Sequence, residues 1–128
     1  METRATNFKY FRLSEFDSKG KDDPAGTGRF MDLEFVAKLD KARGIAWIPF
    51  KINSGYRTIT HNKAVGGVPN SSHTKGLAAD ISCTNNRNRF LIVNALMEVG
   101  INRIIVYKTF IHCDVDPEKT PDTLIIKW

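Results

Sequence analysis

The chain has 128 residues, 41% hydrophobic and 26% charged, a composition typical of one soluble globular domain over residues 1–128. No apolar run approaches the roughly 20 residues of a membrane-spanning helix, which argues against a membrane span. The net charge of +5, from 19 Lys and Arg against 14 Asp and Glu, favours an anionic partner through long-range steering. Nucleic acid, anionic cell-wall polymers and acidic peptide stems all fit this charge.

The basic residues are dispersed, without a Lys/Arg block or an RNP-like aromatic pattern, so we expect no direct nucleic-acid binding. Residues 1–8 lack the apolar region of a secretory signal, which predicts synthesis in the cytoplasm and export through something outside this chain. Cys83 and Cys113 form no CxxC pair. We interpret both as small core residues rather than as metal ligands or disulfide partners.

In the first half of the chain, residues 18–29 are rich in Gly, Asp and Lys and indicate an exposed loop. Asp32 then N-caps an amphipathic helix that we expect to end at Gly44. Residues 50–52 predict a strand entered through a proline-defined corner. The long connection over residues 54–72 contains several Gly, Pro and Ser and one expected helical turn, and connections of this length are usually functional.

The second half contains a buried strand over residues 77–83 and a second helix over residues 86–99, which Gly100 ends. Three further strands are expected in the tail, over residues 103–107, 110–115 and 123–128. The predicted fold is α+β, with a small, mainly antiparallel sheet packed against two helices.

Two histidines and an aspartate among small residues could offer three ligands to one zinc ion: His73, Asp80 and His112. Catalytic zinc sites use three protein ligands and keep the fourth position for water, whereas structural sites close all four, commonly with several cysteines. With only two cysteines, the chain favours an open, hydrolytic site. By spacing alone the HxxxxxxD pattern is loose, and a single histidine such as His61 is usually a surface or core residue.

The predicted strands suggest how these ligands could meet. His73 lies on a loop, and Asp80 lies on the following strand with the small Ala78 on the same face. His112 and Asp114 are two apart on a later strand, so both project to one face while the apolar residues between and beside them face the core. Pairing of the two strands would place His112 beside Asp80.

Four segments combine in an order that is hard to obtain by chance: Ser54-Gly55-Tyr56-Arg57, residues 61–67 (HNKAVGG), residues 71–80 (SSHTKGLAAD) and residues 110–115 (FIHCDV). Over residues 11–128 the chain resembles the family of zinc D-Ala-D-Ala peptidases, most closely its compact, phage-associated branch. The resemblance implies the fold of those peptidases and of hedgehog-type domains. It also implies Zn²⁺ bound by three ligands: His73, Asp80 and His112.

The same resemblance implies roles for residues near the metal. Arg57 would bind a substrate carboxylate or a polarised carbonyl, because its planar fork suits such groups; a structural ion pair is the alternative. Ser71 would form a hydrogen bond near the site. Tyr56 is a further substrate-binding candidate, although packing is the more usual role of such a residue.

The chain departs from the family in one position. Several members carry a carboxylate three residues before the second histidine, where it serves as general base, but Thr109 occupies that position here. The carboxylate nearest in sequence is Asp114, which we expect either to activate the zinc-bound water or to orient His112. Asp116 is a weaker candidate because it lies farther along, toward Pro117.

The sequence thus predicts a zinc metallopeptidase that cleaves peptide stems or cross-links of bacterial peptidoglycan, as a carboxypeptidase or an endopeptidase. It would act on the wall as a phage or prophage endolysin, as part of a phage particle, or as an exported bacterial protein. The bond cut could be L-Ala–D-Glu, D-Ala–D-Ala or a cross-bridge. The alternatives are a non-catalytic zinc module that binds wall peptides or a protein partner, and a basic nucleic-acid binder that needs no zinc.

Overall fold

The computed structural model describes residues 8–19 and 27–127. Most of the loop expected over residues 18–29, and the end of the last strand at Trp128, lie outside these residues. In chain order, the described elements are η1 Leu13–Phe16, η2 Gly28–Phe30, α1 Leu33–Ala46, β1 Ile52–Ser54, α2 Ile59–Ala64, η3 Ser72–Lys75, β2 Ala78–Ser82, α3 Asn86–Glu98, β3 Arg103–Tyr107, β4 Phe110–Asp114 and β5 Thr123–Lys127. The η elements are short 3₁₀ helices.

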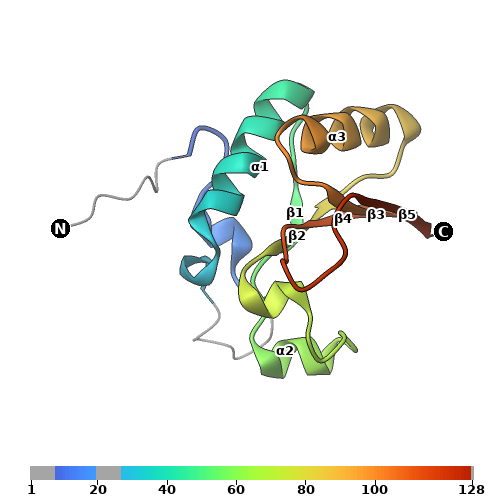
Figure 1. Ribbon diagram of the computed structural model, residues 1–128. Coiled ribbons are helices and arrows are strands. Elements are labelled where there is room, and N and C mark those ends of the chain that lie inside the picture. Colours follow the sequence, from blue (N-terminus) through green and yellow to red (C-terminus); the bar gives the residue numbers. More distant parts are fainter. Residues whose placement is uncertain (1–7, 20–26, 128) are drawn as a thin grey trace.

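The strands form one sheet in the order β1-β2-β4-β3-β5, antiparallel except for the parallel pair β3–β5. The long helices α1 and α3 cover one face, and η3 and α2 lie on the other side (Figure 1). The predicted α+β fold, with a mainly antiparallel sheet and two packed helices, is therefore confirmed. Among the described helices, none is long and apolar enough to cross a membrane.

The two sheet faces separate by alternation, as the strand pattern predicts. Ala79 and Ile81 of β2, with Ile111 and Cys113 of β4, belong to the apolar core beneath the helices. The polar residues between them therefore project to the opposite face. Cys113 and Cys83 are buried free thiols, which confirms their interpretation as core residues.

Helix α1 begins as expected but ends later. The Asp32 carboxylate accepts hydrogen bonds from the backbone N–H groups of Glu34 and Phe35 at 2.9 and 3.3 Å. The expected end at Gly44 is wrong: the helix continues to Ala46, and Trp47 takes the left-handed cap conformation at φ 62°. Gly44 instead allows close packing, because a Cβ there would lie 3.3 Å from the ring of Tyr10.

The connection over residues 54–72 carries more order than the sequence indicates. The strand that leads into it, β1, lies at Ile52–Ser54 rather than at residues 50–52, and Ser54 pairs with Asp80 of β2. The expected helical turn is confirmed as α2, which begins after Thr58. The segment crosses the face of the sheet opposite the long helices (Figure 1).

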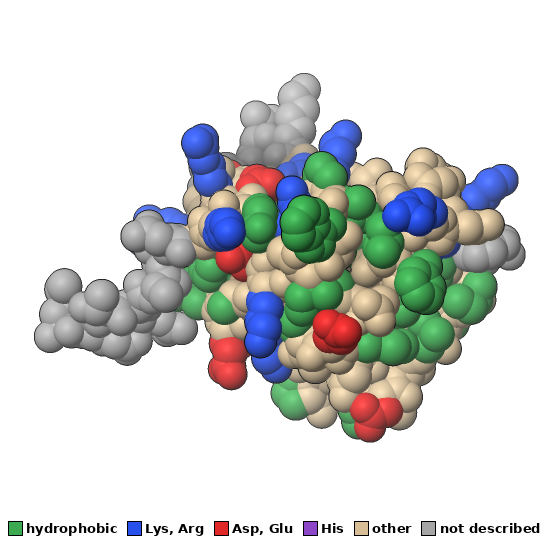
Figure 2. All heavy atoms as spheres, turned by 90° about the horizontal axis from the view of Figure 1, so that it is seen from above, with side chains coloured by type: hydrophobic (Ala, Val, Ile, Leu, Met, Phe, Trp, Pro, Cys, Tyr) green, Lys and Arg blue, Asp and Glu red, His purple; other side chains and the backbone are tan. Residues whose placement is uncertain are grey.

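The helix-covered face of the molecule carries basic side chains scattered among apolar ones. Figure 2 shows this face from above, with Lys and Arg side chains spaced apart and no histidine in view. The view agrees with the dispersed charge of the sequence, and the histidines lie elsewhere on the molecule.

Candidate metal centre

Three side chains that could bind a metal ion meet on the side of the sheet away from the long helices. Asp80 and His112 are cross-strand partners in the β2–β4 ladder, and His73 reaches them from η3. One donor atom from each residue lies within 4.8 Å of the others. Asp80 Oδ1 is 3.3 Å from His73 Nε2 and 2.9 Å from His112 Nδ1, so these atoms point at a common centre.

The short helix η3 positions His73. The Ser71 hydroxyl caps it by accepting the backbone N–H of His73 at 3.2 Å. Gly76 ends it at φ 71°, where a Cβ would lie 2.2 Å from the carbonyl oxygen of Phe30. Asp32 donates its N–H to the Gly76 carbonyl at 2.9 Å, which fixes this turn to the start of α1. Ser71 is buried at this position.

The second nitrogen of each histidine is also held. His73 Nδ1 lies 2.8 Å from the carbonyl oxygen of Gly55, which leaves Nε2 for a metal. His112 Nε2 lies 2.7 Å from Asp114 Oδ2, which leaves Nδ1. Metal-binding histidines typically donate their other N–H to a carbonyl or a carboxylate in this way, which fixes the tautomer and the ring orientation.

The donor set fits zinc. Two imidazole nitrogens and one carboxylate oxygen are a ligand combination of catalytic zinc sites, which leave a position open. The donors are largely enclosed, with side-chain exposures of 4% for His73, 10% for Asp80 and 14% for His112. Zinc would therefore be held by His73, Asp80 and His112, the three ligands that the sequence predicts.

The electrostatics of the cluster favour charged forms despite burial. Burial opposes ionisation of Asp80, but hydrogen bonds with His112 and His73 outweigh it and hold its pKa well below the usual range. Burial likewise lowers the pKa of His112, yet the neighbouring carboxylates of Asp114 and Asp80 raise it overall. A metal ligand must be the neutral ring, so zinc would take the place of a proton on Nδ1 while Nε2–H still donates to Asp114.

Arg57 lies against Asp80, the candidate carboxylate ligand. Its Nη2 is 3.5 Å from Asp80 Oδ2, its Nε donates to Ser54 Oγ at 3.0 Å, and 16% of its side chain is exposed. Tyr56, the preceding residue, packs its ring against Phe30 at 5.3 Å between centroids. The structure thus brings Arg57 to the centre and gives Tyr56 a packing contact; substrate contacts by Arg57, Tyr56 and Ser71 stay predictions.

Asn62 belongs to this arrangement, although no sequence pattern predicted a role for it. Its Oδ1 accepts from Arg57 Nη1 at 3.1 Å, and its Nδ2 donates to the Val68 carbonyl at 2.8 Å. A Cβ at Gly67 would lie 2.0 Å from Asn62 Oδ1, so the glycine is required for this contact. The sequence feature that could have indicated this contact is an amide side chain five residues after Arg57 and four before the Gly66-Gly67 pair.

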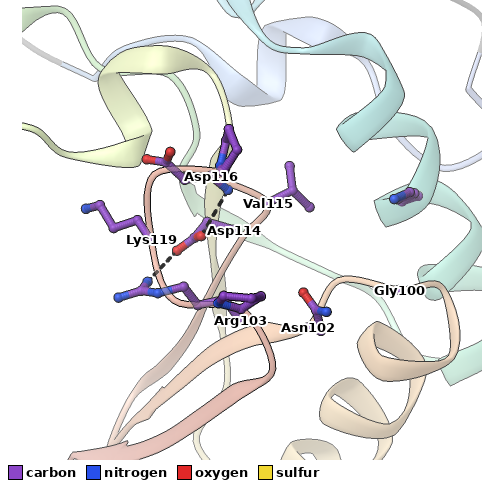
Figure 3. A pocket seen from close by; sticks show the side chains of 10 residues that line it. Gly100, Asn102, Arg103, Asp114, Val115, Asp116 and Lys119 are labelled. Atoms are coloured by element: carbon purple, nitrogen blue, oxygen red, sulfur yellow. Dashed lines mark hydrogen bonds and ion pairs between the residues drawn. The ribbon is translucent and has the colours of Figure 1, made fainter.

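Asp114 lies behind His112 and is fully buried. Its Oδ2 accepts from Arg103 Nη1 at 2.7 Å, and its Oδ1 accepts the backbone N–H of Asp116 at 3.2 Å (Figure 3). Burial opposes its ionisation, but His112 and Arg103 together lower its pKa. The position is that of a residue that orients His112. Arg103 had no assigned role in the sequence analysis.

Asp116 has a different environment, away from the three ligands. Its carboxylate accepts from Ser72 Oγ at 2.8 Å and pairs with Lys75 Nζ at 3.0 Å. Both partners lie on η3, so Asp116 ties the loop after β4 to the helix that carries His73. His61 lies on α2 and is not part of the metal-binding group found in the described residues.

Comparison with known proteins agrees with this site. Residues 9–114 match the model of the Peptidase M15 family, which covers most of the chain. The chain belongs to the peptidase M15 family. A zinc D-Ala-D-Ala carboxypeptidase of Streptomyces albus G is 37% identical over 78 residues, which are 59% of this chain and 31% of that relative. The matched part thus spans about a third of the relative's length. The resemblance to zinc D-Ala-D-Ala peptidases is confirmed, whereas the likeness to their phage-associated branch stays a prediction.

Proposed function

We propose that this chain is a zinc metallopeptidase that hydrolyses peptide stems or cross-links of bacterial peptidoglycan. The convergence of His73, Asp80 and His112 in a member of a peptidase family carries this proposal. The name of the Streptomyces albus G relative supports both zinc and a D-Ala-containing peptide substrate.

Zinc held by His73, Asp80 and His112 would supply an activated water at neutral pH and would polarise the scissile carbonyl. The residues around the metal bind the substrate and orient the ligands. Arg57 receives a substrate carboxylate or the oxygen that gains negative charge, since its side chain is 16% exposed beside Asp80. Asp114 holds the His112 ring in the orientation in which Nδ1 faces the metal.

The net charge of +5 supports dwelling on an anionic wall through long-range attraction. We propose synthesis in the cytoplasm followed by action on the wall, as a phage or prophage endolysin, as part of a phage particle, or after export. Whether the enzyme is a carboxypeptidase or an endopeptidase depends on the bond it cuts, which the first experiment identifies.

The experiment is digestion of purified peptidoglycan with products identified by mass spectrometry. It compares the zinc-loaded protein, the chelated protein and the His73→Ala variant. New peptide termini that appear only with the zinc-loaded wild type support the peptidase and identify the bond. Intact walls in all three samples, despite bound zinc, would contradict it.

A non-catalytic zinc module that binds wall peptides is the second candidate. The observation that favours it is the complete burial of Asp114, the expected base, between His112 and Arg103. This candidate predicts zinc-dependent retention on insoluble peptidoglycan without new termini.

A further inference from the structure

The carboxylate behind His112 is held from two sides. Asp114 is fully buried, and its Oδ2 lies 2.7 Å from both His112 Nε2 and Arg103 Nη1. Its Oδ1 accepts a longer hydrogen bond from the backbone N–H of Asp116, at 3.2 Å. A buried carboxylate is costly unless its charge is paired and its oxygens are hydrogen-bonded, so the orientation of Asp114 depends on these few donors.

Arg103 supplies the permanent charge among them. It lies on β3 directly opposite Asp114 in the β3–β4 ladder, and 18% of its side chain is exposed. Its guanidinium lies at the edge of a cavity of about 200 Å³ that Asn102 and Lys119 also line (Figure 3). Any loss of the guanidinium would open the carboxylate to water from this cavity.

We infer that Arg103 is a positioning residue of the metal centre, acting through Asp114 on His112. The inference rests on the proposed zinc site and deepens it. The three side chains form one line, from guanidinium to carboxylate to imidazole, whose far end is Nδ1 facing Asp80. Without Arg103, the Asp114 carboxylate is free to turn toward cavity water, and His112 then loses the partner that fixes its ring.

The test is zinc affinity, measured by competition with a chromophoric chelator, so it needs no substrate. Arg103→Met is expected to raise the zinc Kd about 3- to 10-fold, less than the 10- to 100-fold typical of a direct partner of a ligand. Arg103→Lys keeps the charge but loses the fork, so a smaller increase is expected. Lys119→Ala, on the same cavity, is the matched control and should leave the Kd unchanged.

A double-mutant cycle separates positioning from general damage. In an Asp114→Asn background, Arg103→Met should have little further effect, because its route to His112 is gone. The absorption spectrum of the cobalt-substituted protein should shift in Arg103→Met and not in Lys119→Ala, since it reports ligand geometry. If Arg103→Met does not fold, Arg103→Lys carries the same comparisons.

Two results would overturn the inference. One is an unchanged zinc Kd in Arg103→Met. The other is an Arg103→Met loss of zinc affinity that is equally large in the wild-type and Asp114→Asn backgrounds. Both assume that the wild type binds zinc. If the wild type bound none, the proposed function itself would fail, so the two failures are distinguishable.

Discussion

The two carboxylates nearest the metal centre each have an arginine, and the two pairs differ in length and burial. Arg103 meets Asp114 at 2.7 Å, and that carboxylate is fully buried. Arg57 meets Asp80 at 3.5 Å, and that carboxylate is 10% exposed. A short pair with a buried partner suits orientation of a ligand, whereas a longer contact beside the open side leaves donor capacity for a substrate. We expect variants at the two sites to separate zinc affinity from turnover.

Loss of a proposed metal ligand should give the largest loss of both zinc affinity and turnover. His73→Ala, or removal of metal by a chelator, should abolish turnover because the remaining donors no longer form a three-ligand site. Atomic absorption measures the loss of bound zinc, and peptidoglycan digestion measures the loss of turnover. A variant without zinc that still releases the same peptide termini would contradict the proposed role of the metal.

Arg57→Ala should reduce kcat/KM about 100- to 1,000-fold, the usual effect of removing one donor from a developing oxyanion. Its zinc Kd should change little, because Asp80 retains both histidine neighbours. Steady-state kinetics on the released peptide, at saturating zinc, give kcat/KM, and competition with a chelator gives the zinc Kd. A large loss of zinc affinity with normal kinetics would instead assign Arg57 to a structural ion pair.

Asp114→Asn should raise the zinc Kd about 10- to 100-fold, because His112 loses a charged partner. Turnover should return largely to normal once zinc is saturating. Activity that stays low at saturating zinc would assign Asp114 to proton transfer rather than to orientation.

Asn62→Ala tests what the contact with Asn62 contributes to the position of Arg57. It removes the Oδ1 acceptor of Arg57 and leaves the Val68 carbonyl without its Nδ2 donor. We expect a loss of about 1–3 kcal/mol in the free energy of unfolding, from the buried groups left unpaired. Turnover should fall roughly tenfold, an energy of about 1.4 kcal/mol, with zinc affinity unchanged. Urea unfolding of the zinc-free protein and kinetics check the two effects; equal loss of zinc affinity would mean that Asn62 acts on the whole site.

The smallest expected effect is a pH dependence at Asp116. Burial raises its pKa, but hydrogen bonds from Glu118, Lys75 and Ser72 lower it overall below its ordinary value of 3.8. A lowered folded-state pKa stabilises the protein above the unfolded value, and this contribution disappears as the pH falls below about 3.8. Asp116→Asn should therefore destabilise the zinc-free protein at pH 7 and less at pH 3, as measured by urea unfolding. An equal destabilisation at both pH values would contradict this.

Local patterns were enough for much of the fold. The alternation in residues 78–82 and 110–114 assigns the polar side chains to one face, because successive side chains in a strand point to opposite faces. Asp32 predicts the start of α1 because a cap depends only on the next three residues. The end of α1 was missed because the packing of Gly44 against Tyr10 involves a segment far away in sequence.

The metal ligands were predicted from residue type, strand face and family resemblance, which all depend on short stretches of sequence. The partners of those ligands were not. The Arg103–Asp114 pair depends on the register between β3 and β4, and the Arg57–Asn62 contact depends on a loop that folds back through Gly67. The sequence by itself therefore determined which side chains could bind a metal. Only the tertiary structure decided which residues hold them in place, because hairpin register brings two strands together without fixing which side chains bond, and no local pattern encodes the approach of a loop such as the one through Gly67.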